Sequence, residues 1–309
     1  MTRPQRLDWF VLILPPLLWA GNFAVGRAAR DVVPPMMLAF ARHAVALAVL
    51  LPFGWSAMRR DMRRYWACRR QLVAVSLTGM VAFNLLVYSG LHATTASNAQ
   101  LLNSTIPVLI VLLSGLFLEQ RLSAAQVFGL ALACAGVLTI VLRGDPARLV
   151  ALQFSRGDLI VLAAMVSFAL FSVLLRGLPA DLDRLGLLGA QLALAVAMLL
   201  PALAWEYAVG GERPSLNAAA LAAMLYVGIA ASLLANLLYM IGIARVGPAR
   251  AGMFIHLVPL YGAIISTACL GERLHLYHAV GMAAIMAGLA CSNMADERRK
   301  AAGRDGSSR

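Results

Sequence analysis

The chain has 309 residues, of which 61% are apolar and only 13% are charged, and its mean hydropathy is +0.80. Soluble domains are about one-quarter charged, so this composition excludes an ordinary soluble protein and predicts an integral membrane protein. The formal charge of +12 does not indicate nucleic-acid binding, because membrane proteins collect their basic residues in loops.

Ten stretches are apolar and long enough to cross a bilayer as helices, which takes about 20 residues. In chain order they are residues 8–28, 34–54, 71–90, 95–117, 122–142, 157–177, 183–206, 217–241, 246–270 and 275–294. The apolar runs are continuous rather than alternating, which predicts an all-α integral membrane protein. Residues 296–309 are charged and predict a cytoplasmic tail. The four cysteines form no CxxC pair, so neither a disulfide framework nor a metal site is expected. No cofactor is expected either.

The spans contain an internal repeat. Asn84–Gly136 matches Asn236–Gly288 without a gap at an offset of 152 residues, with 14 of 53 positions identical. This match predicts a duplication, with one five-helix unit in residues 1–146 and another in residues 147–295. Because five is odd, the second unit is inverted. Transporters use such inverted repeats, with the substrate site near the midplane of the membrane.

The distribution of basic residues predicts the orientation. If the N-terminus is inside, the cytoplasmic segments contain 18 Arg and Lys residues and the outer loops contain 7. The positive-inside rule therefore predicts that both termini face the cytoplasm.

Two prolines, Pro107 and Pro259, occupy matching positions inside the fourth and ninth spans. Each removes one helical hydrogen bond and leaves a carbonyl free, at Asn103 and Ile255. Irregular backbone within a membrane is tolerated where it lines a wet cavity or is buried in protein. We therefore predict two hinges beside a cavity, with the polar side chains of Asn103 and His256 near the kinks. The alternative is a pair of purely structural kinks.

Several polar side chains lie deep inside predicted spans. Asn22, Asn84 and Asn236 could bind substrate or hydrogen-bond a neighbouring helix, and duplication of the last two favours the structural role. Arg42 and His43 form the charged or titratable pair that lies deepest in a span. A buried arginine is costly in a membrane, so it should face the bundle interior. There it could attract a carboxylate or bond to helix carbonyls.

Aromatic rings accompany these polar groups at Trp19, Tyr88 and Tyr239. A cavity with aromatic walls and a few polar groups suits a partly apolar solute. Ordinary packing is the alternative for any single ring.

Acidic residues such as Asp158 and Glu272 lie at or near the ends of predicted spans, and none lies well inside one. Ion-driven carriers often use a carboxylate within the membrane. The sequence therefore favours facilitated transport, and coupling through His43 or His256 is the alternative.

Small residues form a stripe in the fifth span and another in the tenth. Such stripes let helices approach closely, so they are expected to buttress the bundle, with a dimer interface as the alternative. The expected assembly is a monomer or a weak homodimer. The stripes consist of Gly129, Ala133 and Gly136, and of Gly281, Ala284 and Gly288.

Trp19–Phe23 reads Trp-Ala-Gly-Asn-Phe, which resembles the first-span signature of the drug/metabolite transporter (DMT) superfamily, EamA type. Leu118–Leu122 and Leu270–Leu274 resemble the repeated junction between the fourth and fifth spans of that family. The first junction departs from the usual Gly-Glu with Glu119-Gln120, and the sixth span lacks the Trp-Gly-Asn-like signature. Within the family, the chain is most like the YddG-type aromatic amino-acid exporters.

The resemblance implies ten helices in two inverted EamA repeats around a central cavity, and export of metabolites across the bacterial inner membrane by alternating access. The expected substrates are amino acids, aromatic and other neutral ones such as threonine or methionine. Nucleotide-sugars, purines and drugs are the alternatives. An enzyme is not expected, because the chain has no HExxH or GxSxG motif. The expected partners are the small-molecule substrate and the lipid bilayer, without nucleic acid. The expected substrate site comprises Trp19, Asn22, Arg42, His43, Asn84, Tyr88, Asn103, Tyr239 and His256.

Overall fold

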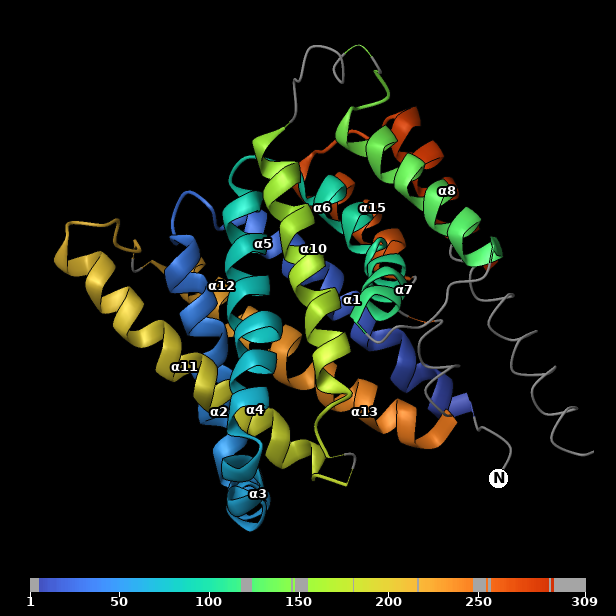
Figure 1. The fold of residues 1–309 in the computed structure, drawn as a ribbon. Helices are drawn as coiled ribbons and strands as arrows, with labels where there is room; N and C mark the ends of the chain where they lie inside the picture. Colours follow the sequence, from blue (N-terminus) through green and yellow to red (C-terminus); the bar gives the residue numbers. More distant parts are fainter. Residues whose placement is uncertain are drawn as a thin grey trace, which may run out of the picture.

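The computed structural model describes residues 6–117, 124–145, 147, 155–179, 181–215, 217–246, 254, 257–288 and 290–291. Within these ranges the chain is helical and contains no β-strand (Figure 1). The all-α prediction is therefore confirmed.

The first half of the chain forms α1 to α8. Their bounds are α1 Arg6–Ala28, α2 Pro35–Arg60, α3 Met62–Ala67, α4 Arg69–Ser76, η1 Leu77–Ala82, α5 Phe83–Leu91, α6 Ala96–Asn103, α7 Ile106–Phe117 and α8 Ala124–Val141. The second half forms α10 Arg156–Leu175, α11 Arg184–Ala208, α12 Ala218–Leu225, η2 Tyr226–Leu234, α13 Ala235–Val246, α15 Leu257–Leu270 and a C-terminal helix, Leu276–Gly288.

Among the residues that the structure describes, six helices are long and apolar enough to cross a membrane, which makes this a multi-pass membrane protein. They coincide with the predicted first, second, third, sixth, seventh and eighth spans. The other four predicted spans correspond to shorter helices, so the count of ten is plausible but not exact. The six are Val11–Ala28, Pro35–Arg60, Arg69–Leu91, Arg156–Leu175, Arg184–Ala208 and Ala218–Tyr239.

The fourth span is broken between α6 and α7, beside Pro107. The N–H groups of Ser104 and Thr105 bond to carbonyls three residues back, at Leu101 and Leu102, both at 3.0 Å. Proline has no N–H to continue the helical ladder, which accounts for the interruption. The kink predicted near Pro107 is confirmed.

Two π-helical segments, η1 and η2, occupy equivalent places in the two halves. Just after each segment, an asparagine side chain bonds to the backbone carbonyl four residues before it. Asn84 Nδ2 donates to the Met80 carbonyl at 2.7 Å, and Asn236 Nδ2 donates to the Ser232 carbonyl at 2.5 Å. A π-turn disrupts the regular i→i−4 bonding, so a side-chain donor is useful there. The amide nitrogen of each asparagine therefore bonds to the backbone of its own helical segment rather than to a neighbouring helix, and a role in substrate binding stays a prediction.

The small-residue stripes of α8 and the C-terminal helix pack against each other within the chain. A Cβ atom at Gly281 would lie 2.9 Å from the Gly136 carbonyl oxygen, and one at Gly288 would lie 2.8 Å from the Ala133 nitrogen. Close helix approach between the predicted fifth and tenth spans is therefore confirmed, and it uses these faces inside one chain.

Replacing Gly136 by alanine should lower thermal stability in detergent by about 1–3 kcal/mol, the usual effect of overpacking. The added Cβ would lie 2.6 Å from the Gly281 carbonyl oxygen, which belongs to backbone and cannot rotate away. Ala131→Val, on the exposed face of the same helix, is the control. Equal melting temperatures for the two variants would contradict this account of the packing.

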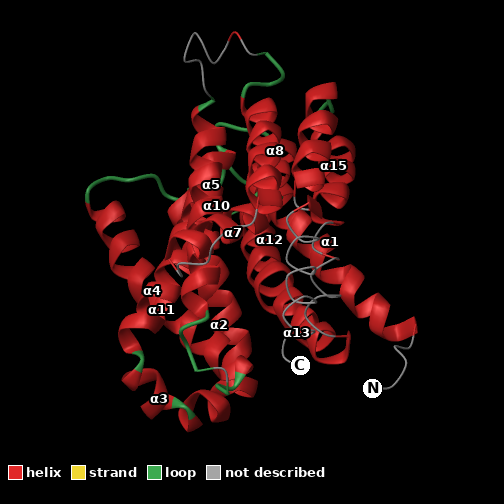
Figure 2. Cartoon of the chain, turned by 45° about the vertical axis from the view of Figure 1, so that its right-hand side comes forward, coloured by secondary structure: helices red, strands yellow, loops and turns green. Residues whose placement is uncertain are grey.

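α3 lies at the end of the bundle away from α8 and α15 (Figure 2), and the chain in and around it contains Arg59, Arg60, Arg63, Arg64, Arg69 and Arg70. Arg60 pairs with Asp183 at 2.8 Å, and Arg64 pairs with Asp181 at 2.5 Å. The Gly186 N–H and the Arg60 guanidinium hold the pKa of Asp183 below its usual value. These exposed pairs join the end of α2 and α3 to the start of α11, and exposed pairs of this kind contribute little to stability.

Candidate functional site

Arg42 is the centre of a buried polar cluster. Its Nη1 donates to Oδ1 of Asn22 at 3.2 Å, to the hydroxyl of Tyr88 at 2.9 Å and to Oδ1 of Asn84. Its Nε donates to the hydroxyl of Ser232 at 2.6 Å. The Tyr88 hydroxyl in turn donates to Oδ1 of Asn22 at 2.8 Å. We call Asn22, Arg42, Asn84, Tyr88 and Ser232 the Arg42 cluster.

Helices from both halves of the chain meet at this cluster. Asn22 lies on α1, Arg42 on α2, and Asn84 and Tyr88 on α5, whereas Ser232 lies on η2 in the second half. Asn84 reaches the guanidinium with its oxygen because its nitrogen is bonded to the preceding π-segment. The local irregularity thus orients a side chain toward the contact between the two halves.

The electrostatics of Arg42 are unusual for a buried charge. The residue is 7% exposed, and all four of its hydrogen-bond acceptors are neutral oxygens. Among the described residues, no Asp or Glu forms an ion pair with it, and no acceptor bonds to its Nη2. Arginine stays protonated in proteins, so this charge is solvated by dipoles without a counter-ion.

Sequence reasoning missed Ser232. The signal was its position four residues before Asn236, in a span otherwise almost wholly apolar. Its hydroxyl accepts from Arg42 and donates to the Val227 carbonyl at 2.6 Å, a bond over five residues that fits the π-helix. Ser232 is the single described residue of the second half that hydrogen-bonds to Arg42.

Ser232→Ala should lower thermal stability by about 1–3 kcal/mol, because it leaves a buried charged donor without its acceptor. Ser172→Ala is the matched control, since that hydroxyl bonds to the Phe168 carbonyl of its own helix at 2.9 Å. Thermal unfolding in detergent measures both. If the two variants lose the same free energy of unfolding, the Arg42–Ser232 hydrogen bond stabilises the protein no more than an ordinary bond within one helix does.

The other predicted site residues lie outside the Arg42 cluster. Trp19 and Tyr239 pack edge to face against each other, with ring centroids 5.3 Å apart. His43 is buried, with Nδ1 2.6 Å from the Ala39 carbonyl oxygen and with Nε2 unpartnered. Asn103 is half-buried at the end of α6, next to the break. The structure thus brings together Asn22, Arg42, Asn84 and Tyr88 but not the rest of the predicted set.

The predicted hinges have different outcomes. Pro107 is the second residue of α7, directly after the break. Pro259 is buried near the start of α15, and the preceding His256 lies outside the described residues. Hinge motion at either proline stays a prediction.

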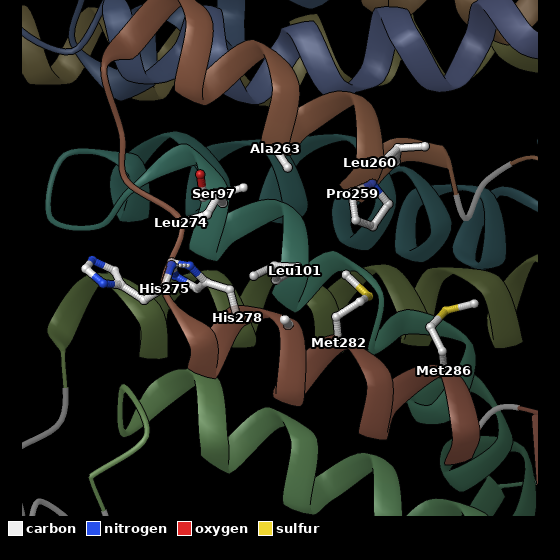
Figure 3. Close-up of a pocket in the computed structure, with 11 residues that line it drawn as sticks. Ser97, Leu101, Pro259, Leu260, Ala263, Leu274, His275, His278, Met282 and Met286 are labelled. Carbon is white, nitrogen blue, oxygen red and sulfur yellow. Dashed lines mark hydrogen bonds between the residues drawn. The ribbon is translucent and has the colours of Figure 1, made fainter.

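A cavity of about 310 Å³ lies between α6, α15 and the C-terminal helix (Figure 3). Ser97, His275 and His278 gather at one end, and Pro259, Met282 and Met286 lie at the other. The walls are mostly apolar. No group of three His, Cys, Asp or Glu side chains in the described part of the chain could hold a metal ion.

Comparison with known proteins gives two matching segments, one in each half of the chain. The model of the EamA-like transporter family matches residues 8–142 and 155–294. An uncharacterized transporter of Bacillus subtilis, YyaM, is 25% identical over 294 residues, which cover 92% of this chain and 93% of the relative.

Two further relatives have names that mention amino acids. A probable terminal-alkyne amino-acid exporter of Streptantibioticus cattleyicolor is 27% identical and covers 85% of each chain. A probable amino-acid metabolite efflux pump of Salmonella typhimurium is 23% identical over 92% of this chain and 94% of the relative. One solved crystal structure matches with a TM-score of 0.60 at 18% identity, over 94% of this chain and 98% of that chain. At this identity, that likeness concerns the fold alone.

Proposed function

Because this chain belongs to the EamA-like transporter family of the DMT superfamily, we propose that it exports amino acids by alternating access. The proposed substrates are aromatic and other neutral amino acids, such as threonine or methionine. The names of the Streptantibioticus and Salmonella relatives support this substrate class.

The observation that carries the proposal is the unpaired charge of Arg42. A buried charge without a counter-ion is costly, so the site favours a ligand that supplies a negative group. The α-carboxylate that all amino acids share is such a group, and a guanidinium binds a carboxylate through two parallel hydrogen bonds. The free Nη2 can supply one of them.

The neutral members of the Arg42 cluster suit the rest of the substrate. Tyr88, Asn22 and Asn84 offer hydroxyl and amide oxygens that can accept from an ammonium group when they release Arg42. We propose that substrate exchanges with these internal bonds rather than entering a permanently open cavity.

We further propose that the protein lies in the bacterial inner membrane with both termini in the cytoplasm. The basic residues around α3 support this orientation. Residues 1–146 and 147–295 are the proposed repeat units, and the two matched segments support that division.

Counterflow in proteoliposomes tests the substrate class. Vesicles loaded with one unlabelled amino acid should accelerate entry of labelled phenylalanine, threonine or methionine without any ion gradient. Loading with phenylalaninamide, which lacks the carboxylate, should give no acceleration. Exchange that is equally fast with the amide would reject Arg42 as a carboxylate site, and no exchange with any amino acid would reject the substrate class.

A further inference from the structure

A second buried polar network lies at the end of the bundle opposite α3. Asp158, the third residue of α10, has 0% exposure. Its carboxylate accepts from the Thr94 hydroxyl and from Nδ2 of Asn98, which lies 3.2 Å from both carboxylate oxygens. Among the described residues, no cation forms an ion pair with it. Its direct hydrogen-bond donors are neutral, and the cation that acts on it, Arg143, does so without an ion pair.

His278 fixes the direction of the hydrogen bonds that lead to Asp158. Its Nδ1 accepts from the His275 backbone N–H at 3.0 Å, as the third side chain of a helix does in a capping box. The neutral ring therefore carries its hydrogen on Nε2, which donates to Oδ1 of Asn98 at 2.8 Å. That bond turns the Asn98 NH2 group toward Asp158. The network as a whole requires a neutral imidazole and an ionised carboxylate.

A second carboxylate, that of Glu272, holds the start of α6. Gly271, with φ +64°, ends α15 and directs the chain toward α6. Glu272 then accepts from the N–H groups of Ala96 and Ser97 at 2.8 and 2.9 Å, and from the Ser97 hydroxyl at 2.7 Å. A carboxylate at a helix N-terminus is favourable because it satisfies free N–H groups and complements the helix dipole.

Apart from the bond between His275 and His278, these bonds cross between the two EamA repeats. The donors Thr94, Ser97 and Asn98 of the first repeat meet Asp158, Glu272 and His278 of the second, and we call these six residues the α6 latch. α6 itself is buried from Ala96 to Leu102, so this end of the bundle is closed. Alternating access requires this end of the bundle to open, and the hydrogen bonds of the α6 latch must then break.

Several charged or titratable groups among the described residues act on the α6 latch. The field of Arg143, in the turn after α8, reaches both Asp158 and His278. His275 and Glu272 also act on His278, and Arg27 acts on Glu272. Ser97 and His278 line the 310 Å³ cavity together with the exposed His275 (Figure 3).

We propose that the α6 latch is a proton-binding site that controls opening of the transporter at this end. A proton taken up by Asp158 converts the carboxylate into a carboxyl group, whose O–H can donate to Thr94 but which attracts the Asn98 NH2 group less. A proton taken up at Nδ1 of His278 removes the acceptor of the His275 N–H. Either event breaks the chain of hydrogen bonds that runs from His278 through Asn98 to Asp158. Acidic pH therefore favours separation of α6 from the second repeat. The proposal rests on alternating access, as in the proposed function, but not on the identity of the substrate.

Hydrogen–deuterium exchange of α6 amides in lipid nanodiscs tests the proposal without any substrate. Exchange is measured at about pH 4 and about pH 8, below and above the usual titration range of histidine, and each rate is divided by the intrinsic rate at that pH. Peptides from α11 serve as the internal reference. In the wild type, corrected exchange of α6 should be about tenfold faster at the lower pH, because opening follows proton binding.

Two variants separate proton binding from simple destabilisation. Asp158→Asn imitates the protonated carboxyl group, so α6 should exchange fast at both pH values and the ratio should fall to about one. His278→Gln, neutral at every pH, should reduce the ratio in part. Asp31→Asn, at the exposed ion pair with Arg30 of the same end, should keep the wild-type ratio.

An unchanged pH ratio in Asp158→Asn would overturn the proposal, because a merely structural role raises exchange equally at both pH values. A wild-type ratio equal to that of α11 would overturn it as well. Failure of amino-acid counterflow would reject only the proposed substrate class, since the exchange measurement needs no substrate.

Discussion

Arg42→Lys should raise the KM for amino-acid counterflow by about 10- to 100-fold, because a charge-assisted hydrogen bond is worth about 1.5–3 kcal/mol. Lysine keeps the positive charge but is a point donor on a flexible stem. Its single ammonium group cannot donate to Asn22, Tyr88 and Ser232 and also form two parallel hydrogen bonds with a carboxylate. Initial rates over a range of external substrate concentrations measure the effect.

Arg60→Lys is the matched control for this substitution. Arg60 lies on the same helix but is exposed, and its pair with Asp183 lies at the α3 end. Its KM should stay at the wild-type value. If Arg42→Lys, purified as a folded protein, also transports with a wild-type KM, then Arg42 is a helix-packing residue and the carboxylate site lies elsewhere.

A comparison of Asn84→Ala with Asn236→Ala should separate the structural role that both asparagines share from the functional role proposed for Asn84. Both variants lose the bond to a π-segment carbonyl, so each should lose about 0.5–1.5 kcal/mol of stability. Asn84→Ala alone also removes an acceptor of Arg42. We expect Asn84→Ala to raise the KM about tenfold, since one further bond of about 1.4 kcal/mol is lost, and Asn236→Ala to leave the KM unchanged.

Melting temperature and counterflow kinetics, measured on the same preparations, provide the comparison. Equal KM changes in the two variants would mean that both asparagines act only through the π-segments. A normal KM in both would remove Asn84 from the substrate site while leaving its backbone bond in place.

The fold was largely predictable because it follows from one-dimensional features. Continuous apolar runs placed the six long helices, and the 152-residue repeat placed Asn84 and Asn236 in equivalent positions. The π-segments were not predictable, because an apolar run looks the same in an α-helix and in a π-helix. The side-chain bonds to Met80 and Ser232 reveal them only in three dimensions.

Four of the five members of the Arg42 cluster were predictable from the sequence, but Ser232 and the geometry of the cluster were not. Asn22, Arg42, Asn84 and Tyr88 were recognisable as polar or aromatic residues in apolar spans. The sequence could not show that one guanidinium bonds to the other three, nor that Ser232 joins them from 190 residues away. A lone serine in a long span carries little information until its neighbours are known.

The sequence by itself determined that this chain spans a membrane, that it is duplicated and that its spans hold a few costly polar groups, since hydropathy and repetition are properties of the chain alone. Only the tertiary structure decided which of those groups meet. Asp158 illustrates the difference: the sequence shows only that it lies near a span end, whereas the structure shows that α10 packs against α6 and α5 and leaves it fully buried. Burial and hydrogen bonding depend on what neighbouring helices bring to a residue, and those helices come from distant parts of the sequence.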